Sequence, residues 1–459
     1  MSLHANQCPS PLSRRDVVVL ATATIAVLAI AAWIRFHNLG AYSFTQDEPA
    51  VVLYVLGRLP DFPLTVSPLS PWATHLGFCL FGVNEFAARF FSAVAGVASL
   101  IAFCIIGHRF ATIRGAFVAA ALIGLSFYHI YFSQTARYPI FEVLFGFALL
   151  ACVVNVASQP TLSIWALIPA LPFVVLGVLS HLFFAKLVFS LGVGIICAYA
   201  PSTIRRARMV GVVVCGLLTV LMVGTTAFPS FGERLHFQGP SFVYNLGRIV
   251  LWESPALWLI GLTSLLLKAR SRFEYILKWS TVVALMWLCI FCLFSNYRAR
   301  YAAWIYPLLA TDALVVTCAL SSRRLPVYAS VVVATCVGIA ELPGLTRYKL
   351  NNHLRSPIKN AIAIVAGEPH GGEVFLASGI GWWAARVYCD DGQVIPIEES
   401  KEFFSGQINP RGAWTLWHTL GEGAPAQRDG YEYEVVDSWK SGTPWISFNY
   451  MLLHYRLRQ

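Results

Sequence analysis

The sequence is poor in charged residues. Asp, Glu, Lys and Arg make up only 12% of its 459 residues, while 57% are hydrophobic. A soluble domain carries about 25% charged residues. This shortage of charge excludes a disordered chain, a coiled coil and a basic nucleic-acid-binding domain. The composition predicts an α-helical polytopic membrane protein.

Other features are missing as well. Most of the 11 cysteines lie in apolar runs, where cysteine acts as a small hydrophobe, so no disulfide framework is expected. No group of cysteines and histidines indicates a metal site. The chain also lacks a glycine-rich phosphate loop, an internal repeat and a signal cleavage site after its first apolar run. The sequence identifies no cofactor, and it does not indicate a divalent metal.

Long apolar runs are abundant, and a membrane-spanning helix needs about 20 apolar residues. Eleven stretches are candidates, near 17–34, 86–106, 115–132, 139–157, 163–179, 182–199, 209–227, 249–267, 274–294, 301–320 and 325–342. Arg and Lys gather in four of the five loops on one side, which the positive-inside rule makes cytoplasmic. The pattern predicts a multi-pass membrane protein with a cytoplasmic N-terminus and a C-terminus on the outer side.

Two segments outside the spans are long. Residues 35–85 form a first outer loop of about 50 residues, far above the usual ~4–6. Its stretches 48–58 and 72–82 suit helices that lie in the membrane interface. Long ordered loops are usually functional, so we expect chemistry here.

The tail beyond residue 343 has a different composition. It holds 11 basic and 12 acidic residues, whereas residues 1–343 hold 22 and 11. A helix is expected at 358–366 and strands at 374–377, 414–417, 432–436 and 445–455. We predict a transmembrane domain, 1–343, followed by a small α/β or α+β domain, 344–459, on the outer side.

Two adjacent carboxylates, Asp47 and Glu48, lie in the first outer loop before Pro49. One interpretation is a helix start, with Asp47 as the cap and Pro49 at an early helical position. The other is catalysis, because a carboxylate at the membrane edge is suited to act as a general base on an acceptor hydroxyl. Capping does not exclude catalysis.

Two further clusters place arginine on the predicted outer side, where it has no topological role. One contains Arg137 and Tyr138, and the other contains Arg298, Arg300 and Tyr301. Arg and Tyr also anchor helices at the interface, which is the plainer interpretation. The functional alternative is an anion site, because the planar guanidinium matches phosphate oxygens.

Three polar residues lie at or inside predicted spans: His181 and Lys186 at the outer start of the span 182–199, and Asp312 within the span 301–320. His181 is either a structural hydrogen-bonding group or part of a substrate site. Lys186 is expected to extend its amine towards the interface. Asp312 is either a functional intramembrane carboxylate or a helix–helix contact.

These clusters, in this order, resemble a known family. The stretches that carry the resemblance are Ile34–Gly40 leading to Asp47-Glu48, Pro68-Leu69 followed by Phe78–Ala93 with its Phe-Gly-x-Asn-Glu-Phe-Ala-Ala-Arg run, Ser133–Tyr138, and Arg300-Tyr301 followed by Pro307. The chain resembles bacterial membrane glycosyltransferases of the GT-C fold: the protein O-mannosyltransferase group, the lipid A aminoarabinose transferases and the RgtA/B/C/D-like transferases.

The resemblance implies inverting transfer of a sugar from a polyprenyl-phosphate carrier to a lipid, glycan or protein acceptor. It places this reaction at the outer, periplasmic face of the bacterial inner membrane. It implies that Asp47 is the catalytic carboxylate, and it matches Arg137 and Arg300-Tyr301 to an arginine and an Arg-Tyr pair of the family. Carrier-phosphate binding by these arginines is an inference from charge.

The chain also departs from the family pattern. Many relatives have Lys or His followed by Pro-Pro-Leu-Tyr-Tyr where this chain has Ser67-Pro68-Leu69-Ser70-Pro71-Trp72. Val66 stands where some relatives use an acidic residue for metal. Two alternatives stay open. A transporter or flippase of lipid-linked sugars would use the same arginines without a base, although the lack of an internal repeat disfavours it. A degenerate protein of this fold that binds or assembles without catalysis is suggested by the missing tyrosines.

Overall fold

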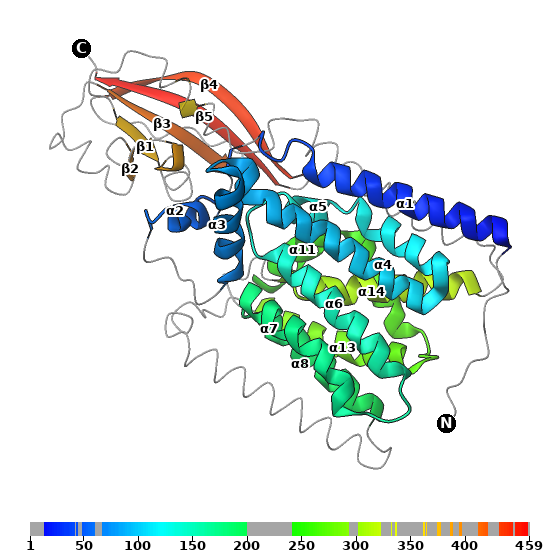
Figure 1. Ribbon diagram of the computed structural model, residues 1–459. Coiled ribbons are helices and arrows are strands. Elements are labelled where there is room, and N and C mark those ends of the chain that lie inside the picture. Colours follow the sequence, from blue (N-terminus) through cyan, green and yellow to red (C-terminus); the bar gives the residue numbers. More distant parts are fainter. Residues whose placement is uncertain are drawn as a thin grey trace.

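A computed structural model gives the arrangement of the chain (Figure 1). It describes residues 13–41, 43–44, 48–59, 67–199, 241–292 and 302–322, with shorter pieces at 332, 336, 361–362, 364, 374–377, 386–388, 394–396, 412–420, 431–443 and 446–457. The described helices form one bundle, and a sheet lies at the end of the bundle that carries the short helices α2 and α3 (Figure 1).

The first two long helices are α1 (Arg14–Phe36) and α4 (Glu85–Gly124), which pack against each other. The helical conformation of α4 breaks at Ala111 and Thr112, where Thr112 has a φ of 56°. The two halves fold back on each other: a Cβ added to Gly107 would collide with the carbonyl of Gly115. The two spans predicted at 86–106 and from 115 onward are therefore separate helical segments.

Four further helices of the bundle are α6 (Pro139–Ser158), α8 (Phe184–Tyr199), α13 (Arg272–Cys292) and α14 (Tyr306–Ser322). α8 packs on α13, and α6 packs on α4. Gly194 allows α8 to approach the backbone of Ile276 closely, since a Cβ there would lie 2.5 Å from that carbonyl oxygen. The core is therefore built from apolar helix faces with glycine at contact points.

Three predicted spans are interrupted. The run 115–132 is divided between α4 and α5 (Phe127–Ser133), and the run 163–179 begins as the 3-10 helix η2 (Ile164–Ala170) before α7 (Leu171–Ser180). The run 249–267 is divided at Ser254 between α11 (Ser241–Glu253) and α12 (Pro255–Thr263), followed by η3 (Ser264–Leu266). Pro255 explains the last break, because proline has no amide hydrogen for the helix, and Ser254 caps the new helix by accepting from the amide of Leu257.

Four of the described helices are long and apolar enough to cross a membrane: α1, α4, α6 and α13. Four shorter apolar helices accompany them, Trp165–Ser180, Phe184–Tyr199, Pro255–Leu266 and Tyr306–Ala319. The predicted span 209–227 lies outside the described residues, and of the predicted span 325–342 only residues 332 and 336 are described, both as helical. The total of eleven spans therefore stays a prediction.

The first outer loop contains two short helices, α2 (Glu48–Val55) and α3 (Leu69–Phe81). Their positions agree with the helices expected at 48–58 and 72–82. α3 packs on the start of α4, where a Cβ on Gly77 would meet the carbonyl of Ala87. The loop is thus folded onto the bundle.

The C-terminal part contains a five-stranded mixed sheet in the order β2-β1-β3-β5-β4. Its strands are β1 (Val374–Ala377), β2 (Val394–Pro396), β3 (Gly412–Leu420), β4 (Tyr431–Thr443) and β5 (Ile446–Leu457). β1 is parallel to β2 and β3, and β5 is antiparallel to β3 and β4. All four predicted strands are found. Residues 361–362 and 364 of the predicted helix 358–366 are helical, and the rest of it lies outside the described residues.

Candidate functional site

Glu48 is the first residue of α2 and is held by two other segments. Its carboxylate accepts hydrogen bonds from Arg89 of α4, Nε to Oε1 and Nη2 to Oε2, both at 2.9 Å. Oε1 also accepts the amide hydrogen of Ala136 at 2.7 Å. Both charged side chains are buried, with 0% and 1% of their surface exposed. The two hydrogen bonds from the guanidinium satisfy both carboxylate oxygens. This bidentate geometry offsets the cost of removing both charges from water.

Arg89 also fixes the chain before α2. Nη1 donates to the carbonyl of Leu39 at 3.1 Å, and Nη2 donates to the carbonyl of Ser43 at 2.9 Å. The guanidinium lies over the ring of Phe44, 5.3 Å from its centroid. One arginine thereby holds the loop on both sides of residues 45–47, which include Asp47 and lie outside the described residues.

The second outer segment, 133–138, lies against the end of α1. Gln134 donates its side-chain amide to the carbonyls of Ile34 at 2.8 Å and Arg35 at 3.1 Å. Arg137 is buried, 3% exposed, and its amide donates to the carbonyl of Thr135 at 2.8 Å. The ring of Tyr138 is also buried. Burial of Arg137 is at odds with a simple anchoring role at the interface, where the head group would reach water.

The structure brings two predicted site residues together. The rings of Tyr138 and His181 stack, with centroids 4.2 Å apart and planes at 21°. Nδ1 of His181 accepts the amide hydrogen of Phe183 at 3.1 Å. Because that nitrogen is an acceptor, the 3.7 Å approach of Glu142 Oε1 to it is a close contact and not a hydrogen bond. His181 thus has a structural partner and also lies beside the second outer segment.

Two buried charges next to this pair were not recognised from the sequence as a site. Glu142 of α6 is fully buried, and its two oxygens have no hydrogen-bond partner among the described residues. Lys186 is 2% exposed, with its amine 3.6 Å from the ring centroid of Phe183 and 3.3 Å from that of Phe291. The expectation that Lys186 extends towards the interface is therefore wrong, because the aromatic rings hold the amine inside by cation–π attraction. Glu142 could have been found from the sequence, because an ionisable residue within an apolar run is a candidate for a functional role.

The remaining predicted residues, Arg298, Arg300 and Tyr301, lie outside the described residues. The chain that follows them is buried over residues 302–318. There Tyr306 donates to Oγ of Ser126 at 3.0 Å and stacks on Tyr128 with centroids 5.1 Å apart. The start of α14 is thus held between α4 and α5.

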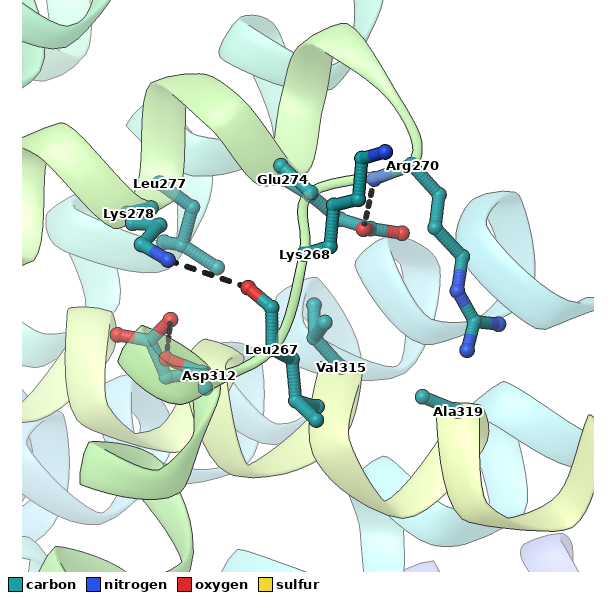
Figure 2. Close-up of a pocket in the computed structure, with 11 residues that line it drawn as sticks. Leu267, Lys268, Arg270, Glu274, Leu277, Lys278, Asp312, Val315 and Ala319 are labelled. Atoms are coloured by element: carbon teal, nitrogen blue, oxygen red, sulfur yellow. Dashed lines mark hydrogen bonds between the residues drawn. The ribbon is translucent and has the colours of Figure 1, made fainter. Parts of the chain in front are cut away.

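Asp312 belongs to a different place in the fold. Its oxygens accept from Ser264 Oγ at 2.7 Å and Thr281 Oγ1 at 2.5 Å, which joins η3 and α13 to α14. It lines a pocket with Lys268, Arg270, Glu274 and Lys278, and Figure 2 shows Lys278 directed at the carbonyl of Leu267. The structure supports the helix–helix interpretation of Asp312.

This pocket is at the other end of α6 from the first outer loop. Arg272, close to it in sequence, donates to the carbonyl of Gln159, just beyond the end of α6. The start of α6 adjoins the segment bonded to Glu48. A helix of 20 residues spans about 30 Å. The pocket therefore belongs to a separate region, and among the described residues no three His, Cys, Asp or Glu side chains gather as a metal site would require.

Comparison with known proteins supports the resemblance. Residues 65–229 match the family of dolichyl-phosphate-mannose-protein mannosyltransferases. No curated protein matches the sequence significantly.

Solved structures are similar in fold. ArnT from Cupriavidus metallidurans in the apo state has 14% identity and a TM-score of 0.55, covering 95% of this chain and 98% of that one. ArnT bound to undecaprenyl phosphate has 13% identity and a TM-score of 0.54, with 96% and 98% covered. The oligosaccharyltransferase AglB from Archaeoglobus fulgidus, in complex with an inhibitory peptide and a dolichol-phosphate, has 14% identity and a TM-score of 0.50, with 86% and 69% covered. The predicted resemblance to membrane glycosyltransferases of the GT-C fold is confirmed.

Proposed function

We propose that this chain, which shares the GT-C fold with ArnT and AglB, transfers a sugar with inversion from a polyprenyl-phosphate donor to an acceptor hydroxyl on the outer face of a bacterial inner membrane. The acceptor class is a lipid, a glycan or a protein. The observation that carries the proposal is the contact of Glu48 with both Arg89 and Ala136, which joins the two outer segments that hold the candidate catalytic and phosphate-binding residues.

The contact between Glu48 and Ala136 matters because the two candidate site residues are their neighbours in the sequence. Asp47 directly precedes Glu48, and Arg137 directly follows Ala136. Consecutive Cα atoms are 3.8 Å apart. Anchoring Glu48 to Ala136 therefore keeps the backbones of Asp47 and Arg137 within the same small region, as a general base and a phosphate ligand of one reaction would need.

In the proposed reaction Asp47 accepts the proton of the acceptor hydroxyl. The acceptor oxygen forms a bond to the anomeric carbon from the face opposite the phosphate. The bond between that carbon and the phosphate oxygen breaks, and polyprenyl phosphate leaves with its bonding electrons. Arg137 and Arg300, with Tyr138, Tyr301 and Arg298 nearby in sequence, stabilise the charge that grows on the phosphate; fixed donors directed at developing charge are a strong catalytic device.

Glu48 takes a different part in this proposal from Asp47. Its oxygens are engaged by Arg89 and Ala136 and it is fully buried. Proton acceptance by this carboxylate would break the ion pair, so we assign it the role of holding the loop.

The test is sugar transfer from a purified polyprenyl-phosphate sugar by Asp47→Asn. The variant keeps size and one hydrogen-bonding oxygen but does not accept a proton at neutral pH. Loss of a general base typically lowers the rate by about 10²–10⁴-fold. Unchanged thermal stability in detergent is the control for folding. Near-normal transfer by Asp47→Asn beside an inactive, folded Glu48→Gln would move the base to Glu48.

A flippase would bind the same lipid but would not need a base. If wild-type protein moves a lipid-linked sugar across vesicles and no transfer product forms with any acceptor, the enzymatic proposal is contradicted. Normal transfer by both Asp47→Asn and Glu48→Gln would show that neither carboxylate of this loop takes part in the reaction.

A further inference from the structure

The C-terminal part of the chain reaches the first outer loop through a short described segment, 386–388. The hydroxyl of Tyr388 accepts the amide hydrogen of Phe44 at 2.9 Å and donates to Oε1 of Glu85 at 3.1 Å. Its ring stacks on that of Phe44, with centroids 6.0 Å apart and planes at 25°. One phenol thus joins the backbone of the loop to the first residue of α4.

A second contact lies on the other side of α2. Nη1 of Arg58 donates to the carbonyl of Arg386 at 3.1 Å, and Nη2 of Arg386 donates to the carbonyl of Arg58 at 3.2 Å. Phe44 precedes α2 and Arg58 follows it. The segment 386–388 therefore holds the loop before and after this helix.

Apolar packing adds to these bonds. Val387 and Tyr388 lie against a buried cluster formed by Phe44, Val52, Phe78, Ala87, Ala88 and Ala136. The members of this cluster come from the loop, α2, α3, α4 and the second outer segment. The C-terminal segment thus packs on a cluster to which the loop, α2, α3, α4 and the second outer segment all contribute.

A continuous series of contacts runs from Tyr388 to the candidate site. Tyr388 stacks on Phe44, Phe44 lies under the guanidinium of Arg89, and Arg89 holds Glu48. Burial raises the pKa of the Tyr388 phenol, and the nearby Glu85 carboxylate raises it further. The hydroxyl therefore keeps its proton at neutral pH and stays a donor to Glu85.

From this geometry we infer that Tyr388 is a positioning residue. It holds residues 43–58, and with them the carboxylate pair, in the arrangement that sugar transfer requires. The C-terminal part of the chain is then needed for turnover and not for binding of the lipid phosphate. This inference rests on the proposed function, because the loop matters for turnover only if it carries the base.

The experiment uses full-length protein in lipid nanodiscs and the variant Tyr388→Phe, which keeps the stacked ring and removes both hydrogen bonds. The matched control is Tyr450→Phe, in the middle of β5. Hydrogen exchange followed by mass spectrometry reports on peptides covering 43–58. Only the bond from the Phe44 amide belongs to the loop. One net hydrogen bond corresponds to a factor of about 3–10, so exchange there should become about 3–10-fold faster in Tyr388→Phe and stay unchanged in the control.

Two further measurements separate positioning from a general structural role. We expect kcat to fall about 10–100-fold in Tyr388→Phe, since small misplacements of a catalytic group have effects of that size. The Kd for undecaprenyl phosphate alone should remain within about 2-fold, because the arginines assigned to the phosphate are unchanged. Glu85→Gln keeps an acceptor oxygen for the phenol and should retain protection of 43–58.

Unchanged exchange of 43–58 in Tyr388→Phe would overturn the inference. So would faster exchange throughout α6 and α8, which would indicate a general loss of structure, or a parallel loss of undecaprenyl phosphate binding. Failure of the proposed function has a different signature: Asp47→Asn would transfer sugar normally, while the exchange result for Tyr388→Phe would stand.

Discussion

Glu48 and Arg89 are buried charges that depend on each other. Each is almost fully removed from solvent. The Glu48 carboxylate accepts hydrogen bonds from two nitrogens of Arg89 and from the backbone amide of Ala136. Removing one member of such a pair leaves an uncompensated charge, which typically costs about 3–5 kcal/mol. The pair therefore ties the position of the first outer loop to the stability of the fold.

We expect Arg89→Gln to lower the free energy of unfolding by about 3–5 kcal/mol. Glu48→Gln combined with Arg89→Gln should cost less than the sum of the single changes, with a coupling energy of about 0.5–3 kcal/mol. Unfolding of detergent-solubilised protein measures both. Arg109→Gln, at an exposed position on the same helix, is the control. Strictly additive losses would contradict the coupling.

A second prediction at the residue scale concerns Arg137 and Arg300. If Arg137 and Arg300 bind the lipid phosphate, replacing either with Lys should still reduce sugar transfer, because Lys keeps the charge but loses the planar fork. Transfer assays and binding of undecaprenyl phosphate measure the effect. Full activity in Arg300→Lys would show that a point charge suffices and would argue against bidentate binding.

At the scale of elements, α4 is the helix on which the loop is built. Its first turn provides Glu85, its second provides Arg89, and its far half folds back at Ala111 and Thr112. The close approach at Gly107 and Gly115 leaves no room for a side chain. The alignment of the two halves therefore depends on glycine at these positions.

Gly107→Ala should destabilise the protein by about 1–3 kcal/mol, because the added methyl collides with backbone and not with a flexible side chain. Gly192→Ala in α8 is the matched control, since a Cβ there meets nothing within 4 Å. That change should stabilise the helix by about 0.5–1 kcal/mol. Thermal unfolding of both variants distinguishes them, and equal effects would contradict the close packing of the α4 halves.

At the scale of the whole molecule, the sheet lies at the same end of the bundle as α2 and α3 (Figure 1). The contacts of Tyr388 and Arg386 join the two parts there. The loop and the C-terminal part must then occupy the same side of the membrane. The distribution of basic residues predicts that this is the outer side.

A fusion of alkaline phosphatase to Gln459 should therefore be enzymatically active in bacterial cells, since that enzyme matures outside the cytoplasm. A reporter that works only in the cytoplasm should be inactive at the same position. A fusion in the loop near Lys268 is the control and should give the reverse result. An active cytoplasmic reporter at Gln459 would mean that the number of spans is wrong by an odd number.

The amino-acid sequence by itself determined the features that depend on local pattern. Apolar runs predicted α1, α6, α8 and α13, and alternation with turn residues predicted the four strands at 374–377, 414–417, 432–436 and 445–455. The Asp47-Glu48 pair and Arg137 were identified by charge in places where charge is rare. The helix and strand predictions succeed because periodicity is a property of short stretches of chain, while the roles of Asp47, Glu48 and Arg137 stay predictions.

Only the tertiary structure decided which distant residues meet. Glu48 and Arg89 are 41 positions apart, and Phe44 and Tyr388 are 344 apart. No local pattern indicates such pairs, because each depends on how helices and loops pack. The same packing placed Lys186 among aromatic rings and left the oxygens of Glu142 facing no hydrogen-bond partner among the described residues. Burial is a property of the assembled bundle, and the burial of Glu48 together with its bonds to Arg89 and Ala136 is the reason that we assign this carboxylate the role of holding the loop.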